Sequence, residues 1–190
     1  MNDRELAWIQ YAASFSSSLS IVGSCFIILS YCHLKCFAGK VREVYIDITK
    51  DLIHILAWFD LIGAVGRVFG QHGYLLCQIQ AFVIEFGDIA PIFWNLVMCY
   101  NLYRWICRGQ DQTQLRKHMP LYLILTLCLS IVICSAALVA GVYGHATLWC
   151  WVTDDLWRYL ALYGWIVVAA LLMIIMLVMV QRDIKSRTRW

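Results

Sequence analysis

Residues 165–180 read WIVVAALLMIIMLVMV, sixteen positions without a charge or a proline. About 20 apolar residues in a row are enough for a helix to cross the hydrocarbon core of a bilayer. A transmembrane β-barrel would instead show short strands of alternating polarity. The whole chain of 190 residues is 62% hydrophobic and only 14% charged. Soluble domains are about 45–50% apolar, so this composition predicts an all-α integral membrane protein.

Four further apolar runs precede this one. We expect one transmembrane domain over residues 1–190, with five helices at about 11–33, 52–69, 77–107, 120–143 and 157–180. Pro120 suits the first turn of the fourth helix, where a proline removes no intrahelical hydrogen bond. Pro91 predicts a kink in the third helix. The sequence shows no internal repeat and no segment typical of a soluble domain.

Basic residues are concentrated in alternate connections. Twelve of the 15 Lys and Arg residues fall in the first connection, around the third connection and in the C-terminal tail: Lys35, Lys40, Arg42, Lys50, Arg104, Arg108, Arg116, Lys117, Arg182, Lys185, Arg187 and Arg189. Cytoplasmic loops of membrane proteins carry an excess of Lys and Arg. We therefore expect these segments in the cytosol and the N-terminus outside. The net charge of +3 is a topology signal and does not indicate nucleic-acid binding.

Ionisable residues inside the predicted spans are the first functional candidates. Asp60 lies in the second span, and Glu85 and Asp88 lie in the third. A charge at the bilayer centre costs about 2.5–3.5 kcal/mol, so we expect these carboxylates to face the bundle, a water-filled cavity or a missing partner. Arg67 is placed where Glu85 can reach it. Polar residues share one face of the third helix, at Gln78, Glu85, Asp88 and Asn95.

Three interpretations of this polar face stay open. The residues line a cavity that opens outward and binds a ligand, or they form a hydrogen-bond network that only holds the helices together. The third interpretation, a proton or ion path, is less favoured because the sequence shows no inverted repeat.

Two of the nine cysteines, Cys77 and Cys150, fall at the predicted outer face. The others lie inside spans or at cytosolic ends, in a reducing compartment. Two cysteines in an oxidising environment predict one disulfide, which ties the third helix to the connection before the fifth. No catalytic motif and no metal-ligand spacing is present, so we expect no enzyme activity, no cofactor and no metal.

A disulfide in this position is a hallmark of G-protein-coupled receptors, and three stretches make the likeness more specific. LWCWV at 148–152, FWNLVMCYNLYRWI at 93–106 and WRYLALYGW at 157–165 resemble the cyclic-AMP receptors of the slime-mould type, which are related to secretin-like receptors. The Asp-Arg-Tyr triplet of rhodopsin-like receptors is absent. Tyr103-Arg104-Trp105 lies near the corresponding place.

The resemblance implies five helices of a seven-helix receptor bundle in the plasma membrane, with a heterotrimeric G protein as partner and an unidentified extracellular ligand. The chain ends where a third cytoplasmic loop would begin, so we expect a fragment or a truncated product. The candidates for the ligand cavity or polar network are Asp60, Arg67, Glu85, Asp88, Asn95, Trp151 and Arg158. The candidates that face the G protein are Arg104 and Arg108.

Two other functions remain as alternatives. The chain is a small transporter or channel subunit that uses the intramembrane carboxylates, or an adaptor that forms an oligomer with a full receptor through small-residue helix faces. Cyclic AMP as the ligand requires cations for its phosphate. Only Arg67 and Arg158 are candidates for that role at the outer side.

Overall fold

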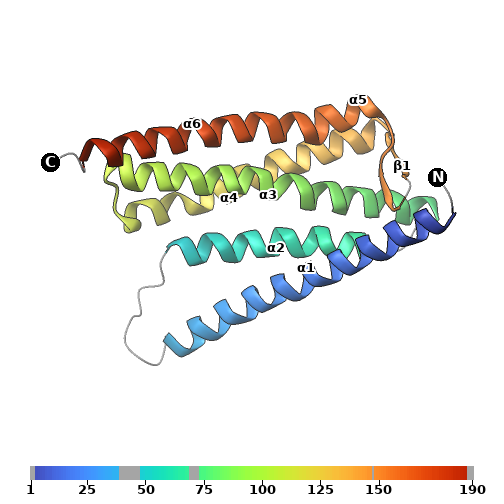
Figure 1. Cartoon of the computed structure of the whole chain (residues 1–190), viewed down its shortest axis with the longest axis horizontal. Coiled ribbons are helices and arrows are strands. Elements are labelled where there is room, and N and C mark those ends of the chain that lie inside the picture. The colour runs from blue at the N-terminus through green and yellow to red at the C-terminus, as the bar shows by residue number, and fades with distance from the viewer. Residues whose placement is uncertain (1–2, 39–47, 69–72, 147, 188–190) are drawn as a thin grey trace.

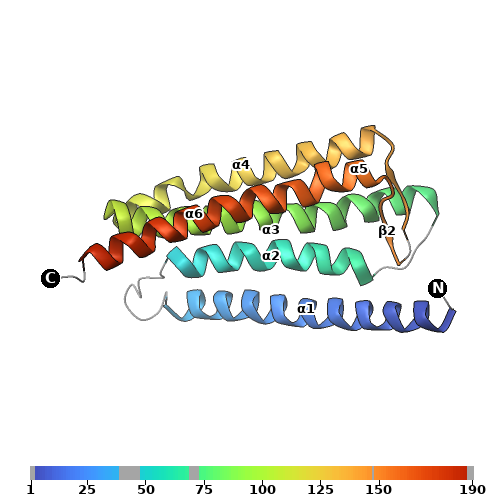
Figure 2. The same ribbon diagram turned by 45° about the horizontal axis from the view of Figure 1, so that its top comes forward.

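The computed structural model describes residues 3–38, 48–68, 73–146 and 148–187. In chain order the elements are α1 (Asp3–Ala38), α2 (Ile48–Val68), α3 (Tyr74–Arg108), α4 (Gln112–Val139), β1 (Tyr143–His145), β2 (Cys150–Val152), α5 (Asp155–Arg158), a π-helical segment η1 (Tyr159–Tyr163) and α6 (Gly164–Arg187). The long helices lie lengthwise beside one another (Figures 1 and 2). The β1–β2 hairpin lies at one end of the bundle, which we call the hairpin end.

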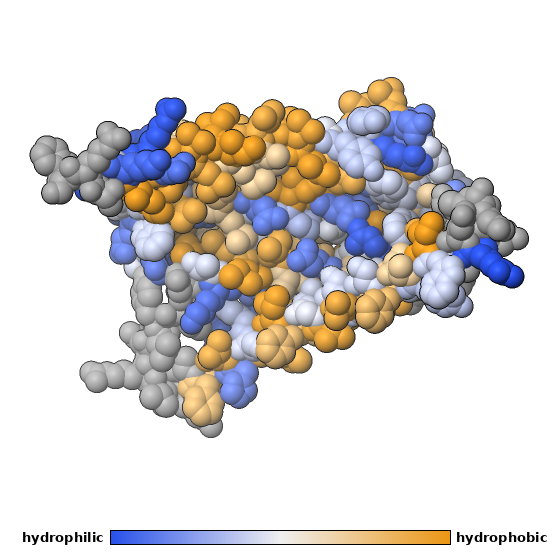
Figure 3. Space-filling model, in the orientation of Figure 1, coloured by the Kyte–Doolittle hydropathy of each residue, from blue (hydrophilic) through white to orange (hydrophobic). Residues whose placement is uncertain are grey.

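Four of the described helical stretches are long and apolar enough to cross a membrane: Trp8–Phe37, Tyr74–Arg108, Gln112–Val139 and Asp155–Arg187, which runs through α5, η1 and α6. Helix α2 is not among them, because Lys50, Asp51, Asp60 and Arg67 interrupt its 21 residues. Figure 3 shows hydrophobic residues along the outer side of α6, where Val167, Leu171 and Ile174 are exposed. The protein is therefore a multi-pass, all-α membrane protein with a short β-hairpin at one end.

Helix α3 is the centre of the bundle and packs against α2, α4 and α6, while α1 packs on α2. The core between α2, α3 and α4 is built around Trp94, which is fully buried. Its indole Nε1 donates a hydrogen bond of 2.8 Å to the main-chain oxygen of Leu52. The ring of Phe59 packs edge-on against it. This core fixes the rotation of α3, and with it the direction of the polar residues nearer the hairpin end.

The fourth helix differs from the expectation at both ends. It begins at Gln112 because the Asp111 carboxylate accepts the Gln112 N–H at 2.8 Å and caps the helix. Pro120 therefore lies inside α4 and not in its first turn. The helix ends at Val139 and not near 143, since Gly141, with a φ of 68°, turns the chain into the hairpin.

The hairpin pairs its two strands antiparallel, with Tyr143 opposite Val152, Gly144 opposite Trp151 and His145 opposite Cys150. The sequence alone predicts only a loop here. Some of the basic residues that predict the orientation, Lys40, Arg42 and Arg189, lie outside the described residues. The orientation of the chain in the membrane therefore stays a prediction.

Candidate functional site

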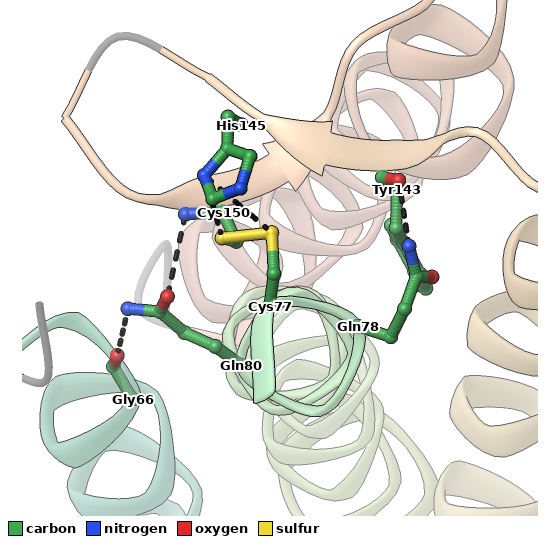
Figure 4. Close-up of a disulfide and its surroundings, with 7 residues drawn as sticks. All are labelled: Gly66, Cys77, Gln78, Gln80, Tyr143, His145 and Cys150. Atoms are coloured by element: carbon green, nitrogen blue, oxygen red, sulfur yellow. Dashed lines mark hydrogen bonds between the residues drawn. A yellow bond between two sulfur atoms is a disulfide. The ribbon is translucent and has the colours of Figure 1, made fainter. Parts of the chain in front are cut away.

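A disulfide joins Cys77, in the first turn of α3, to Cys150 at the start of β2 (Figure 4). The two Cα atoms are 5.2 Å apart, and both side chains are buried. This is the pair that the sequence predicts. The bond fastens the hairpin over the end of α3, so that the residues of β2 face the polar part of that helix.

Two glutamines of α3 hold the hairpin independently of the disulfide. Gln78 Nε2 donates a hydrogen bond of 2.9 Å to the main-chain oxygen of Tyr143. Gln80 accepts the Cys150 N–H at 3.4 Å and donates at 3.0 Å to the main-chain oxygen of Gly66. Gln80 thus links the hairpin, α3 and α2 in one buried contact (Figure 4).

Tyr143 anchors the hairpin to α4. Its hydroxyl donates a hydrogen bond of 3.1 Å to the main-chain oxygen of Cys134. Burial raises the pKa of Tyr143 well above its ordinary value, so the phenol keeps its proton and stays a donor at physiological pH. The hairpin is therefore held to α3 and to α4 at once.

The central feature of the site is a buried carboxylate under the hairpin. Glu85 of α3 is fully buried, and the Trp151 indole N–H donates to its Oε2. Its other oxygen, Oε1, accepts no hydrogen bond from the described residues. The Arg158 guanidinium lies 5.7 Å from the centroid of the Trp151 ring, a cation–π contact. Trp151 thus connects a buried acid to a cation at the start of the last long helix.

Asp88, one turn along α3 from Glu85, forms an ion pair with Arg67 of α2. The prediction that Arg67 lies within reach of Glu85 is wrong. The arginine reaches Asp88 because the backbones of α2 and α3 meet beside that residue, at Gly63 and Gly87. Glu85 instead lies under the hairpin, where Trp151 of β2 bonds it.

Two of the predicted site residues do not belong to this group. Asp60 and Asn95 are both exposed among the described residues, so Asp60 does not face this bundle, and of the three expected surroundings a missing partner remains. Its neighbour Phe59 is the side chain that α2 directs into the core. A residue next to a core position points about 100° away from it on a helix. The expected single polar face of α3 therefore divides. Gln78 and Glu85 contact the hairpin, Asp88 pairs with Arg67 of α2, and Asn95 is exposed.

At the opposite end of the bundle, the predicted Arg104 donates to the Tyr122 hydroxyl and stacks 5.7 Å from the centroid of the Tyr100 ring. Arg108, in the last turn of α3, is exposed. A cavity of about 350 Å³ opens between α2, α3, α4 and α6 at this end, with an apolar lining that includes Met98, Leu102, Trp105 and Leu177.

A second ion pair of the bundle lies at this end, opposite the hairpin, and joins helices that the sequence alone does not connect. Asp51 of α2 accepts a hydrogen bond from Tyr31 of α1 and pairs at 2.7 Å with Arg116 of α4. The sequence alone does not single out Asp51, Gln80 or Tyr143, which form these contacts. Gln80 follows Cys77 at the i+3 spacing that places two residues on one helix face. This spacing was the signal that could have found it.

Residues 3–188 match the slime mold cyclic AMP receptor family. The chain belongs to that family. It is 29% identical over 165 residues to the "Ascaroside receptor GPR2" of Arthrobotrys oligospora, with 82% of this chain and 40% of the relative covered. It is 27% identical over 143 residues to "G-protein coupled receptor 1" of Arabidopsis thaliana, with 74% of this chain and 40% of the relative covered. It is 25% identical over 161 residues to "Cyclic AMP receptor 2" of Dictyostelium discoideum, with 80% of this chain and 40% of the relative covered.

The family resemblance read from the sequence is thus confirmed. The matched family is one of receptors, and the three relatives also carry receptor names. The chain spans about two fifths of the length of the relatives that it matches.

Proposed function

We propose that this chain is the part of a G-protein-coupled receptor that receives an extracellular signal and passes it to a heterotrimeric G protein. One observation carries the proposal: in a receptor-family chain, a disulfide-anchored hairpin places Trp151 on the buried Glu85 of the central helix. A ligand that moves the hairpin acts directly on α3, because that helix holds the hairpin through Cys77, Gln78 and Gln80.

The central helix supplies the route between the two ends. Helix α3 is continuous over 35 residues and so spans about 50 Å. Near its other end, Arg104 bonds Tyr122 of α4. The receptor then has two states that differ in these cytosolic contacts. A ligand that binds one state more tightly shifts α3 at Glu85 and raises the population of that state.

The proposal treats residues 1–190 as one transmembrane domain of five spans in the plasma membrane, with α2 as the second. Helix α2 lies in line with its neighbours in both views (Figures 1 and 2). Its Arg67 is neutralised by Asp88, which lowers the cost of placing α2 in the membrane. Five crossings put the two termini on opposite sides, in keeping with their positions in Figure 1. The N-terminus and the hairpin are then outside.

We infer a ligand without a phosphate group. The names of two relatives specify ascarosides and cyclic AMP as their ligands. The two cations proposed for a phosphate are both engaged, Arg67 by Asp88 and Arg158 by Asp155 at 2.8 Å. Arg158 also donates at 2.8 Å to the main-chain oxygen of Val152. A cyclic nucleotide would have to displace a carboxylate before it bound either side chain.

The test measures binding of a G protein to the full chain in lipid vesicles. Purified nucleotide-free heterotrimer should sediment with vesicles that contain the protein and not with empty ones. Arg108→Glu, at the cytosolic end of α3, should reduce this binding at least about tenfold, because it reverses an exposed charge at the proposed interface. Arg4→Glu is the matched control, since Arg4 is exposed near the opposite end of the bundle. No binding by correctly inserted protein would overturn the proposal.

The same vesicles separate the receptor from a transporter. A proton or cation flux that Glu85→Gln abolishes would favour the transporter. The structure gives that alternative little support, because Glu85 and Asp88 are engaged by Trp151 and Arg67. Neither carboxylate lines the cavity at the other end of the bundle.

A further inference from the structure

His145 of β1 lies directly over the disulfide that joins α3 to the hairpin (Figure 4). Its Nδ1 atom is 3.6 Å from Cys150 Sγ and 3.9 Å from Cys77 Sγ. These three atoms lie within 4.8 Å of one another. The two sulfurs cannot bind a metal while they are joined in the disulfide, because cysteine binds metals as the thiolate. The receptor function gives His145 no role.

We propose that reduction of the Cys77–Cys150 disulfide by a dithiol creates a zinc site formed by Cys77, His145 and Cys150. The dithiol gives two electrons and two protons: its own sulfurs become joined, and the Cys77–Cys150 bond becomes two thiols. Zn²⁺ then displaces both thiol protons into solvent and binds the two thiolates and the His145 Nδ1 lone pair. A water molecule completes the tetrahedral set, as in zinc sites with three protein ligands.

Contacts other than the disulfide keep these residues together after reduction. His145 and Cys150 are directly opposite each other in the β1–β2 pairing. Gln80 holds the Cys150 N–H, and Gln78 holds the main-chain oxygen of Tyr143. Hydrogen bonds therefore still join α3 to the hairpin when the sulfurs separate. Zn–S bonds of about 2.3 Å and a Zn–N bond of about 2.0 Å fit donors that start this close together.

The charge and exposure of the cluster also suit zinc. Two thiolates neutralise the double charge of the ion, which matters because both cysteine side chains are buried. His145 is exposed and gives the ion a way in from solvent. Sulfur and imidazole ligands favour zinc over Mg²⁺ or Ca²⁺, which prefer oxygen.

The experiment uses Co²⁺ as a spectroscopic probe with the full chain in detergent micelles. One sample is reduced with dithiothreitol and desalted without oxygen, and the other keeps its disulfide. Seven other cysteines of the described residues are free thiols in both samples, so the comparison isolates Cys77 and Cys150. The reduced protein should bind one more Co²⁺, with thiolate-to-cobalt absorption that Zn²⁺ removes. His145→Ala should weaken this binding at least about tenfold, and His118→Ala at the other end of the bundle should not.

A second measurement does not depend on the variants. Zn²⁺ should protect Cys77 and Cys150 of the reduced wild-type protein from alkylation, as read residue by residue by mass spectrometry. Equal cobalt binding by the reduced and oxidised samples, or equal alkylation with and without Zn²⁺, would overturn the proposal. Neither result bears on coupling to a G protein, so this proposal and the receptor proposal fail separately.

Discussion

Gly63 of α2 and Gly87 of α3 meet backbone to backbone. A Cβ atom added to Gly87 would lie 2.3 Å from the Gly63 Cα and 2.5 Å from its nitrogen. Small residues at such a crossing let two membrane helices approach closely enough to gain van der Waals contact. Arg67 is one turn beyond Gly63, and Asp88 is the next residue after Gly87. The ion pair between α2 and α3 is therefore a consequence of this close approach.

Gly87→Ala should destabilise the bundle, because the new methyl group forces the two helices apart. We expect a loss of about 1–3 kcal/mol in the free energy of unfolding, the usual cost of overpacking. Gly23→Ala in α1 is the matched control, since its Cβ would have no atom within 4 Å. That change should be neutral or slightly stabilising. Denaturant unfolding in micelles measures both variants, and equal stability would show that the helices do not meet here.

Trp151→Phe keeps an aromatic ring in place and removes the N–H that bonds Glu85. It leaves a fully buried carboxylate without that donor, at a cost of about 1–3 kcal/mol in the free energy of unfolding. Glu85→Gln combined with Trp151→Phe should cost less than the two single changes added together, because the residues interact directly. Trp8→Phe, at an exposed position, is the control and should have no effect. Additive losses in this cycle would rule out the contact.

Arg67→Gln should cost more than a surface charge does, because it leaves Asp88 without its cation in the membrane. The two side chains are 26% and 23% exposed, so we expect a loss of up to about 3 kcal/mol, the lower end for a buried pair. Arg187→Gln breaks the more exposed pair with Asp183 and should cost under about 1 kcal/mol. Asp88→Asn should partly rescue Arg67→Gln. Thermal unfolding compares the variants, and equal effects of the two arginine changes would contradict the assignment of this pair.

Cys77→Ser with Cys150→Ser should lower stability, because the disulfide spans a sequence separation of 73 residues. The chain-entropy estimate for such a loop is about 4–4.5 kcal/mol. Cys32→Ser with Cys36→Ser is the control, since both are exposed free thiols. The control makes the same chemical change at two cysteines that form no bridge. Non-reducing mass mapping and unfolding of both double variants test this, and free thiols at 77 and 150 in the wild-type protein would end the prediction.

The sequence alone predicts the features that depend on composition and on short segments. The apolar runs predict the helical membrane class, and the Cys77–Cys150 pair follows once the outer cysteines are separated from the rest. The family likeness comes from residues 148–152 and two other short stretches. Each of these inferences requires only local sequence and the expected order of the helices.

What the sequence could not predict depends on how the helices are rotated against one another. The partner of Arg67 is set by the crossing at Gly63 and Gly87, whose residues are far apart in the chain. The same rotation directs Phe59 inward and leaves Asp60 exposed. The position of His145 follows from strand pairing in a segment that reads as a loop. Short stretches of sequence do not specify which residues of different helices and strands come into contact.

The orientation of the bundle is the last prediction. The hairpin end should be extracellular and the end that carries Arg104 and Arg108 cytosolic. Gly73→Cys and Lys117→Cys place a thiol at each end, at exposed positions just before α3 and within the first turns of α4. In intact cells an impermeant maleimide should label the first variant and not the second, with the parent protein as background. Permeabilised cells should give labelling of both, which controls for the reactivity of each thiol.

Labelling of Lys117→Cys alone in intact cells would reverse the topology. It would put the hairpin, the disulfide and the proposed ligand site on the wrong side of the membrane for an extracellular signal.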